Sequence, residues 1–453
     1  MISKTAEVAA AKPHQNPPNL QEIAQFALER AKACGATAAE VEISTSVGQS
    51  VSVRLKEVET IEYNRDKGMG ITVYLGQQKG AASTSDLSRD AIIRTVEAAC
   101  AIAKYTEADE FSGLADPARL FKGALPELGL NQPWVLSVDD AIKIAVECEA
   151  AAYAVDKRIN NSEGASVTNH TSDFIYANSN GFMNGYPTSR ASLSVAVIAS
   201  DANGMQRDYW YTSARGEVGL KSAAHVGKIA GQRTVARLGS KRIATCEAPV
   251  LFDNTSSGSL IGSFVGAVSG SSLYRKASFL QDSVGLQVFA PMLQIREEPH
   301  LQGASSSSPF DGEGVATVAR DVVRDGVVQG YFLGSYSARK LGLQSTGNAG
   351  GNHNLQVKSG ELDFAGLVKK MGRGLIVSEL MGQGVNMVTG DYSRGIAGFW
   401  VEGGEIVHPV EELTIAGNMK DMYKGIVDIG TDINKTGSKH VGSILVDKMS
   451  LAG

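Results

Sequence analysis

Glycine is concentrated in the C-terminal part of this chain, and the concentration limits what that part can fold into. The 69 residues from Gly330 to Gly398 contain 15 of the 50 glycines in the 453-residue sequence. Glycine suits helix interiors poorly but permits tight turns and close approaches of the backbone. Asp325-Gly326 and Gly403-Gly404 are typical of two-residue hairpin turns. Short strand-like runs recur at residues 249–252, 318–323, 326–333, 374–380, 398–401, 405–407, 411–415 and 443–449.

Many short strands at regular spacing are typical of a sandwich or a barrel. We therefore predict that residues 241–453 form a glycine-rich, mainly β domain that is barrel- or sandwich-like. One core rarely serves more than about 250–300 residues, so we expect further packed units ahead of this domain.

The first half of the chain alternates between helical and strand-like periods. Apolar residues recur with the helical period over residues 19–34, 85–104, 137–155 and 223–238. Alternating residues between these helices predict strands, with a hairpin around Gly48 and a turn at residues 64–68. The fold class is therefore α+β, in which N-terminal α/β-layer units precede the β-rich domain. We predict a disordered leader at 1–18, an N-terminal α+β unit at 19–105, a connector at 106–136 and a second α+β unit at 137–240.

Charge and hydropathy exclude several classes of protein. The 43 basic and 48 acidic residues give a net charge of −5, and no block of five like charges occurs. A nucleic-acid or membrane-surface protein would need a basic face, so we expect neither kind of partner. No apolar run is long enough for a transmembrane helix, and the N-terminus lacks the apolar core of a secretory signal. The four cysteines are far apart, which favours buried, reduced thiols in a cytoplasmic protein.

Motifs for familiar hydrolytic chemistry are weak or missing. The seven histidines are never closer than 32 residues, so no pair can face one zinc ion from a single helix turn. A metal site assembled from remote residues remains open. No Gly-x-Ser-x-Gly is present, and Ser337–Lys340 with Lys435–Gly437 matches a serine-enzyme pattern only weakly. Trp210 and Trp400 lie in strand-like context and are expected to pack rather than to stack on a ligand.

Several long strings of residues resemble one known family. They are Arg207–Tyr211, Ala267–Arg275, Ser335–Leu343, Thr346–Gly351, Glu379–Asn386, Thr389–Gly395 and Glu411–Met419. Together they resemble the TldD/PmbA family of peptidases, and the resemblance covers nearly the whole chain beyond residue 19. The family implies a cytoplasmic bacterial protease that is assembled from two related subunits and degrades or processes unfolded peptides.

The resemblance also assigns this chain to one kind of subunit. TldD-like chains carry His-Glu-x-x-x-His, whereas chains of the PmbA/TldE type lack it. The equivalent stretch here is Phe264–Ser269, in which Phe264 and Ser269 replace the histidines and Val265 replaces the glutamate. The expected arrangement is a subunit that carries no catalytic residue or metal of its own, in an oligomer with a TldD-like partner that holds zinc. Two alternatives stay open: an active metallopeptidase with a non-local metal site, and a non-catalytic peptide-binding or scaffold protein.

Strand addition is a recognition mode that needs no peptide sequence, because main-chain hydrogen bonds supply the affinity. Residues 380–386 are a strand-like run that ends in glycines, and Thr346–Asn348 and Asp391–Ser393 are polar, glycine-flanked segments. We therefore predict a groove for unfolded peptide there. The competing interpretation is that these glycines only shape turns of the sheet. The predicted peptide-binding residues are Asn348, Gly382, Gln383, Gly384, Asn386, Asp391, Tyr392 and Ser393.

Overall fold

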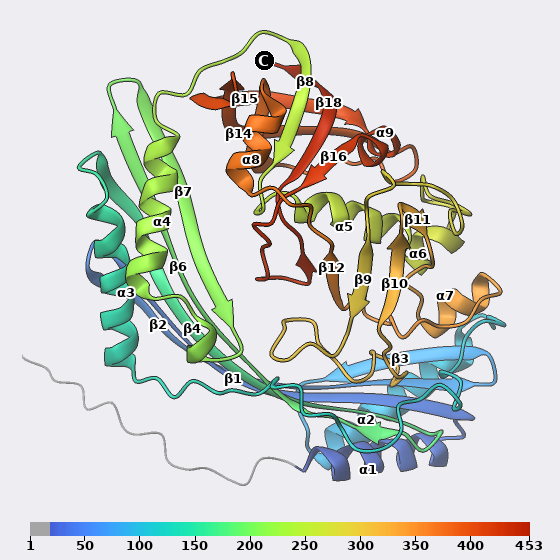
Figure 1. Ribbon diagram of the computed structural model, residues 1–453. Coiled ribbons are helices and arrows are strands. Elements are labelled where there is room, and N and C mark those ends of the chain that lie inside the picture. Colours follow the sequence, from blue (N-terminus) through green and yellow to red (C-terminus); the bar gives the residue numbers. More distant parts are fainter. Residues whose placement is uncertain (1–18) are drawn as a thin grey trace, which may run out of the picture.

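The computed structural model describes residues 19–453, and the predicted leader at residues 1–18 lies outside this range. The fold is mixed α+β, as predicted, and is built around three sheets (Figure 1). Within residues 19–453 no helix is both long enough and apolar enough to cross a membrane.

The largest sheet is formed by the N-terminal half of the chain. Its strand order is β3-β2-β1-β4-β6-β7, and the short strand β5 pairs with β4. All neighbouring strands in it are antiparallel. Figure 1 shows this sheet bending around the C-terminal half of the chain. Its strands are β1 (Ala38–Arg54), β2 (Glu57–Leu75), β3 (Gln78–Thr84), β4 (Ile159–Asn178), β5 (Met183–Asn184), β6 (Pro187–Asp201) and β7 (Gly204–Ala214).

Two pairs of helices cover the outer face of the long sheet at its two ends (Figure 1). Side chains of Asn19, Ser88, Ser137 and Ser222 accept backbone N–H groups at the four N-termini, which explains where these helices begin. Alanine-rich helix faces pack on apolar strand residues and form two separate cores. The helices are α1 (Leu20–Ala33) with α2 (Arg89–Tyr105), and α3 (Val138–Tyr153) with α4 (Ala223–Ala236).

The predicted breaks inside two strands are wrong. Gly48 lies in the middle of β1, and residues 64–68 lie in the middle of β2. Both segments are fixed by cross-strand pairing, which overrides their local turn preference. A Cβ at Gly48 would lie 2.8 Å from the imidazole Nδ1 of His170, so glycine here permits a close approach rather than a turn. Because β4 pairs with β1 along most of its length, one sheet runs through both predicted α+β units. The division into those units stays a prediction.

The C-terminal half contains the predicted barrel. Strands β15, β14, β13, β8 and β18 follow one another, and pairing of β15 with β18 closes the ring, with β16 beside β18. The turns at Asp325-Gly326 and Gly403-Gly404 have positive φ at both residues, as the primed type requires. The barrel strands and β16 are β8 (Cys246–Phe252), β13 (Gly374–Met381), β14 (Asp391–Glu402), β15 (Glu405–Asn418), β16 (Ile426–Ile429) and β18 (Ile444–Ala452).

A smaller sheet and short helices complete this half. The sheet has the order β11-β10-β9-β12-β17 and shares one large core with the barrel. Its strands are β9 (Ile295–Glu298), β10 (Arg320–Arg324), β11 (Val327–Val328), β12 (Asn354–Val357) and β17 (Lys439–His440). The helices are α5 (Gly258–Ala267), α6 (Gly270–Tyr274), α7 (Ser335–Lys340), α8 (Phe364–Met371) and α9 (Met419–Lys424), and a 3-10 turn, η1 (Glu217–Gly219), follows β7.

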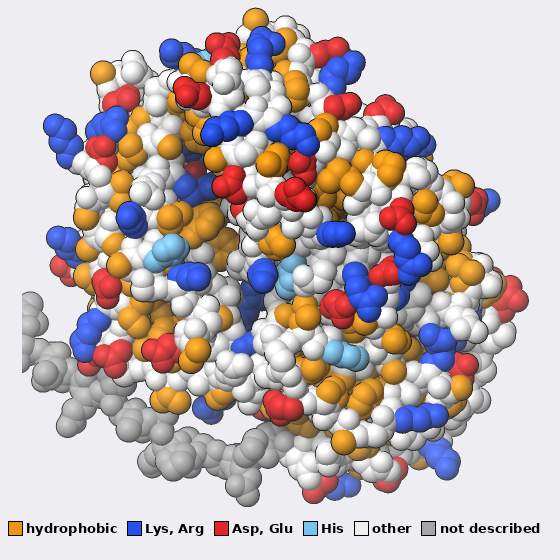
Figure 2. All heavy atoms as spheres, viewed as in Figure 1, with side chains coloured by type: hydrophobic (Ala, Val, Ile, Leu, Met, Phe, Trp, Pro, Cys, Tyr) orange, Lys and Arg blue, Asp and Glu red, His pale blue; other side chains and the backbone are white. Residues whose placement is uncertain are grey.

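An aromatic cluster joins the two halves near one end of the long sheet. Phe310 from the C-terminal half packs against Phe174 and Tyr186, with ring centroids 6.2 and 5.5 Å apart. The opposite end of the sheet carries α4 and β7 (Figure 1), which face the barrel across a hollow (Figure 2). This hollow is the first candidate site.

Candidate functional site

A cleft of about 690 Å³ separates β7 and α4 from the C-terminal half. Figure 2 shows it as a hollow with hydrophobic side chains gathered in its depth. Segments from distant parts of the sequence form its two walls. One wall comprises Asp208–Ser213, Gly219, Lys221, His225 and Arg233, and the other Asn254–Ser256, Ser259, Ser378–Leu380, Arg394 and Ile433–Thr436.

The wall formed by β7 presents a strand edge. Six consecutive residues of β7 line the cleft, whereas the face of a strand would contribute every second residue. β7 is the last strand of its sheet, and no strand of residues 19–453 pairs with its outer edge. Its unpaired backbone groups are a template on which an extended chain can add as a further strand.

Two tyrosines stand beside this edge. Tyr209 and Tyr211 are 45% and 41% exposed, and their rings stack with centroids 6.4 Å apart. They lie on the face of β7 that the helices do not cover, because the alternate residue Trp210 packs under the guanidinium of Arg233 from α4, 5.3 Å from its ring centroid. Partial burial raises the pKa of the Tyr211 hydroxyl, so it stays neutral. Exposed aromatic rings with a polar tip are suited to hold a peptide by its side chains.

Buried ion pairs connect the two walls. Arg233 and Arg237, one turn apart on and just after α4, both approach Asp208 of β7, at 3.3 and 3.6 Å. Arg237 also pairs with Glu379 of β13, and Arg233 donates to the backbone oxygen of Ser378 at 3.4 Å. The side chain of Asp208 is only 5% exposed, so removing either arginine would leave a buried charge poorly compensated. The network therefore fixes the position of α4 and β7 relative to the barrel.

The structure brings together seven of the eight predicted peptide-binding residues. Residues 382–386 fold back on residues 391–393: Asn386 N donates to Asp391 O and Ser393 N donates to Gly384 O, both at 2.8 Å. A Cβ on Gly384 would lie 1.8 Å from Ser393 O, so this glycine allows the close return of the chain. The side-chain oxygen of Asn386 accepts the N–H groups of residues 388 and 389. Most of this loop's polar groups are thus used inside the loop.

The remaining residues of that prediction differ in exposure. Gln383 is exposed, while Tyr392 is buried and its pKa is raised to about 12 by desolvation. Asn348 belongs to another part of the fold: it is 4% exposed, donates to Glu297 at 2.8 Å and to Gly351 O at 3.1 Å, and accepts from Arg320. These hydrogen bonds indicate that the Asn348 side chain holds the neighbouring segments of the chain in place. Peptide binding by these eight residues stays a prediction.

The helix that corresponds to the expected metal-binding stretch packs against apolar side chains. Phe264 on α5 is fully buried, and its ring lies 5.0 Å from that of Phe289 and 6.4 Å from that of Tyr423, in edge-to-face contacts. The Ser269 hydroxyl, just after α5, donates to Gly266 O at 2.9 Å. Neither Phe264 nor Val265 has an atom that can coordinate a metal, so these residues do not fit a zinc ion. In residues 19–453 no three His, Cys, Asp or Glu side chains are grouped as metal ligands.

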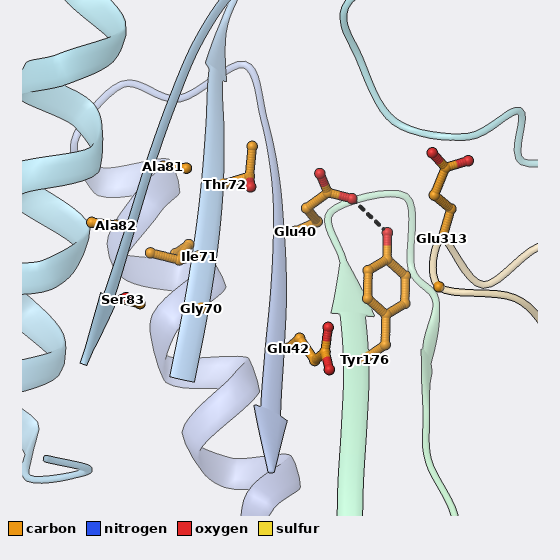
Figure 3. A pocket seen from close by; sticks show the side chains of 11 residues that line it. Glu40, Glu42, Gly70, Ile71, Thr72, Ala81, Ala82, Ser83, Tyr176 and Glu313 are labelled. Atoms are coloured by element: carbon orange, nitrogen blue, oxygen red, sulfur yellow. Dashed lines mark hydrogen bonds between the residues drawn. The ribbon is translucent and has the colours of Figure 1, made fainter. Parts of the chain in front are cut away.

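A second concave region lies on the inner face of β1, β2 and β3. Figure 3 shows the carboxyl groups of Glu40, Glu42 and Glu313 around this pocket of about 480 Å³, with Tyr176 between them. Glu40 accepts the hydroxyl groups of Tyr176 and Tyr74 at 2.7 and 2.8 Å. Burial, followed by the charge of Glu40, raises the pKa of both phenols, which fixes them as hydrogen-bond donors. The pocket has a negative field, but nothing in it indicates a bound group.

Sequence reasoning missed the cleft. The residues that form it come from several segments between Asp208 and Thr436, and they meet only because the long sheet curves around the barrel. Trp210 was expected to pack, and it does, against Arg233. One feature of the sequence could have indicated the cleft. Tyr209, Trp210 and Tyr211 are consecutive, so they place aromatic side chains on both faces of one strand.

Comparisons with known proteins find relatives that match this chain over most of its length. Family models for the PmbA/TldA metallopeptidase match residues 39–103 (domain 1), 131–238 (central domain) and 245–453 (C-terminal domain). The chain is 48% identical to "Metalloprotease PmbA" of Escherichia coli O157:H7 over 96% of each chain. It is 46% identical to "Metalloprotease PmbA homolog" of Haemophilus influenzae, over 99% of this chain and all of that one.

Solved structures show the same architecture. A protein from Bacteroides thetaiotaomicron, described as a candidate modulator of DNA gyrase, matches with a TM-score of 0.90 and 28% identity, over 95% of this chain and 98% of that one. TldE from Thermococcus kodakarensis matches with a TM-score of 0.83 and 18% identity, over 95% of this chain and 100% of that one, which speaks for the fold alone.

Proposed function

The chain belongs to the PmbA/TldD metallopeptidase family, and we propose that it is the PmbA/TldE-type subunit of a two-chain peptidase. In this proposal a TldD-like chain supplies the zinc, and the complex cleaves unfolded peptides. The observation that carries the proposal is the packing of Phe264: the ring occupies the core at the position where TldD-like chains are expected to hold a ligand.

This chain's contribution is the binding of substrate. An unfolded peptide has its backbone N–H and C=O groups free, and the edge of β7 offers the matching groups along the cleft. Tyr209 and Tyr211 would lie along the added strand and contact its side chains. Main-chain pairing would bind many peptide sequences, and a folded protein could not present an extended segment to this cleft. Zinc in the partner would polarise the scissile carbonyl and activate water.

Reconstitution with a TldD-like chain from the same organism tests the proposal. We expect no hydrolysis of an unfolded peptide by this chain alone, and hydrolysis when both chains are mixed. Changing Tyr209 and Tyr211 to alanine should raise KM for the peptide in the complex, because the binding wall is removed while the metal-holding chain is untouched. Met205→Ala is the matched control, since Met205 is exposed on β7 but does not line the cleft.

Three results would contradict parts of this proposal. Hydrolysis by this chain alone, abolished by a chelator, would favour the alternative of a non-local metal site. Failure of the two chains to associate would contradict the two-chain arrangement. An unchanged KM in the tyrosine variant would remove the β7 cleft from the substrate path and leave the rest of the proposal standing.

A further inference from the structure

The cleft beside β7 carries positive side chains that no carboxylate neutralises. Lys221, Arg394 and Lys435 line it, and within residues 19–453 none of the three forms an ion pair with an aspartate or a glutamate. Figure 2 shows Lys and Arg side chains on both sides of the hollow. The whole chain has a net charge of −5, so this concentration of positive charge is a local feature of the cleft.

The acidic side chains at the cleft do not offset these charges. Asp208 and Glu379 both pair with Arg237, and Asp208 also pairs with Arg233. Asp253 lies 3.9 Å from Arg233 and outside the lining, where burial raises the pKa of its carboxyl group. Cations therefore outnumber carboxylates at the cleft, even when Asp253 is counted as ionised.

Lys221 is held beside the open strand edge. Its backbone N–H donates to the Thr212 hydroxyl of β7 at 3.1 Å, and Ser222, the next residue, caps the N-terminus of α4. The backbone is thus anchored on both sides of Lys221, while the side chain itself is exposed. An ammonium group on such a flexible stem can reach the carboxylates of a peptide strand that is added to β7.

Lys435 and Arg394 stand on the opposite wall. The loop that carries Lys435 is tied to the segment before α5, because Asn434 donates to Asn254 O at 3.2 Å. Arg394 of β14 donates to Gly382 O at 2.6 Å, a contact that does not neutralise its charge. An extended peptide in the cleft would therefore meet positive side chains on both walls.

We propose that this cleft selects extended peptide segments rich in aspartate and glutamate. The preference rests on the proposed function, in which an unfolded peptide adds to the edge of β7. Main-chain pairing is the same for every sequence, so charge is the property by which the cleft can distinguish peptides. Alternate side chains of an added strand point toward the same wall, so acidic residues at every second position can pair with its cations.

Binding of short labelled peptides to the full chain, followed by fluorescence anisotropy, tests the proposal. The complex with the TldD-like chain serves as a second sample. Three peptides are amidated at the C-terminus and differ only at alternate positions, which hold Glu, Gln or Lys. We expect the Glu peptide to bind about tenfold or more tightly than the Gln peptide, and the Lys peptide to bind most weakly. The preference should shrink at about 0.5 M salt, which screens exposed charges.

Charge reversal locates the preference. Lys221→Glu combined with Lys435→Glu should lower the affinity for the Glu peptide by about tenfold or more and leave that for the Gln peptide nearly unchanged. The matched control is Lys32→Glu combined with Lys104→Glu, which changes the net charge equally. Both control residues are exposed, on α1 and α2 at the other end of the long sheet. Equal circular dichroism spectra would show that all variants are folded.

Each contrary result has a distinct meaning. Equal affinity for the Glu and Gln peptides would overturn the preference and leave the proposed function standing. Weak binding of all peptides to both samples would instead contradict substrate binding at the β7 cleft, and the preference with it. A control variant that weakens the Glu peptide as much as the cleft variant would also overturn the preference. So would a Gln peptide with a free C-terminal carboxylate that binds as tightly as the amidated Glu peptide.

Discussion

Among single residues, Phe264 most directly limits what this chain can bind at the position of the family's metal motif. Its ring fills the core between Phe289 and Tyr423, at a position that the family resemblance identifies with a metal ligand. We predict that Phe264→Ala lowers the free energy of unfolding by about 3–5 kcal/mol, the usual cost of an aromatic cavity. Urea unfolding followed by circular dichroism measures this. The zinc content of the purified chain should not change. A loss well under 1 kcal/mol would show that the ring is not part of the core.

Asp311 makes a pH-dependent contribution to stability. Its carboxyl group is 5% exposed and accepts backbone N–H groups from residues 313, 315 and 349, yet burial raises its pKa from 3.8 to about 6. Between these pH values the folded chain holds a proton that the unfolded chain has released. Stability from Asp311 is therefore present below about pH 4 and is lost as the pH rises through 6.

The stability lost through Asp311 should be on the order of 3 kcal/mol, the free energy that corresponds to raising its pKa from 3.8 to about 6. Urea unfolding at pH 4.5, 5.5 and 7 measures it as a difference in slope between the natural chain and Asp311→Asn, which cannot titrate. We expect stability to fall with pH more steeply in the natural chain. Because the amide also changes the hydrogen bonds, the slope is the readout. Parallel pH profiles for the two proteins would contradict the raised pKa.

At the scale of elements, the side chains of the loop at residues 382–386 have two different roles. One holds the loop together and another is exposed, and the sequence alone could not tell them apart. Asn386 holds the loop together, whereas the side chain of Gln383 is exposed. If the loop contacts peptide, Gln383→Ala should raise KM several-fold in the two-chain complex and leave partner affinity unchanged. Steady-state kinetics and a binding titration measure both quantities. Gln356, which bonds His440 at 2.7 Å, is an unsuitable control, whereas the exposed Gln21 on α1 is suitable.

Helices and strands differ in how far they can be predicted. The four N-terminal helices were predicted within a few residues, because their caps and apolar faces are local features. The strands β1 and β2 were divided too early, since their length depends on partners that are distant in sequence. Strands β9, β12 and β17 were missed: they are short, and pairing alone holds them as strands. The barrel was predicted as a class, and its closure by β15 and β18 was not.

The candidate site was predictable only in part, for the same reason. The loop that joins β13 to β14 is local, so its residues were grouped correctly. Asn348 was grouped with them because it lies in a polar, glycine-flanked segment, but its side chain belongs to another hydrogen-bond network. The cleft beside β7 requires the curvature of the whole sheet, and no pattern along the chain encodes which strand edge faces the barrel.

At the scale of the whole molecule, the uncovered β7 edge of the long sheet suggests how this chain would bind a ligand. The β7 edge faces a cleft and suits a transient, extended ligand. The chain also retains the architecture of TldE while lacking metal ligands on α5. A subunit of this kind would shape and bind the substrate of a peptidase whose chemistry lies in its partner.

The most direct test of this account is the zinc content of the two chains, measured by elemental analysis on each chain purified alone and on their complex. We predict no stoichiometric zinc in this chain alone, and in the complex an amount of zinc equal to that of the TldD-like chain. Peptide hydrolysis should follow that zinc and be lost when it is removed with a chelator. One tightly bound zinc in this chain alone, lost together with an activity of its own, would contradict the account.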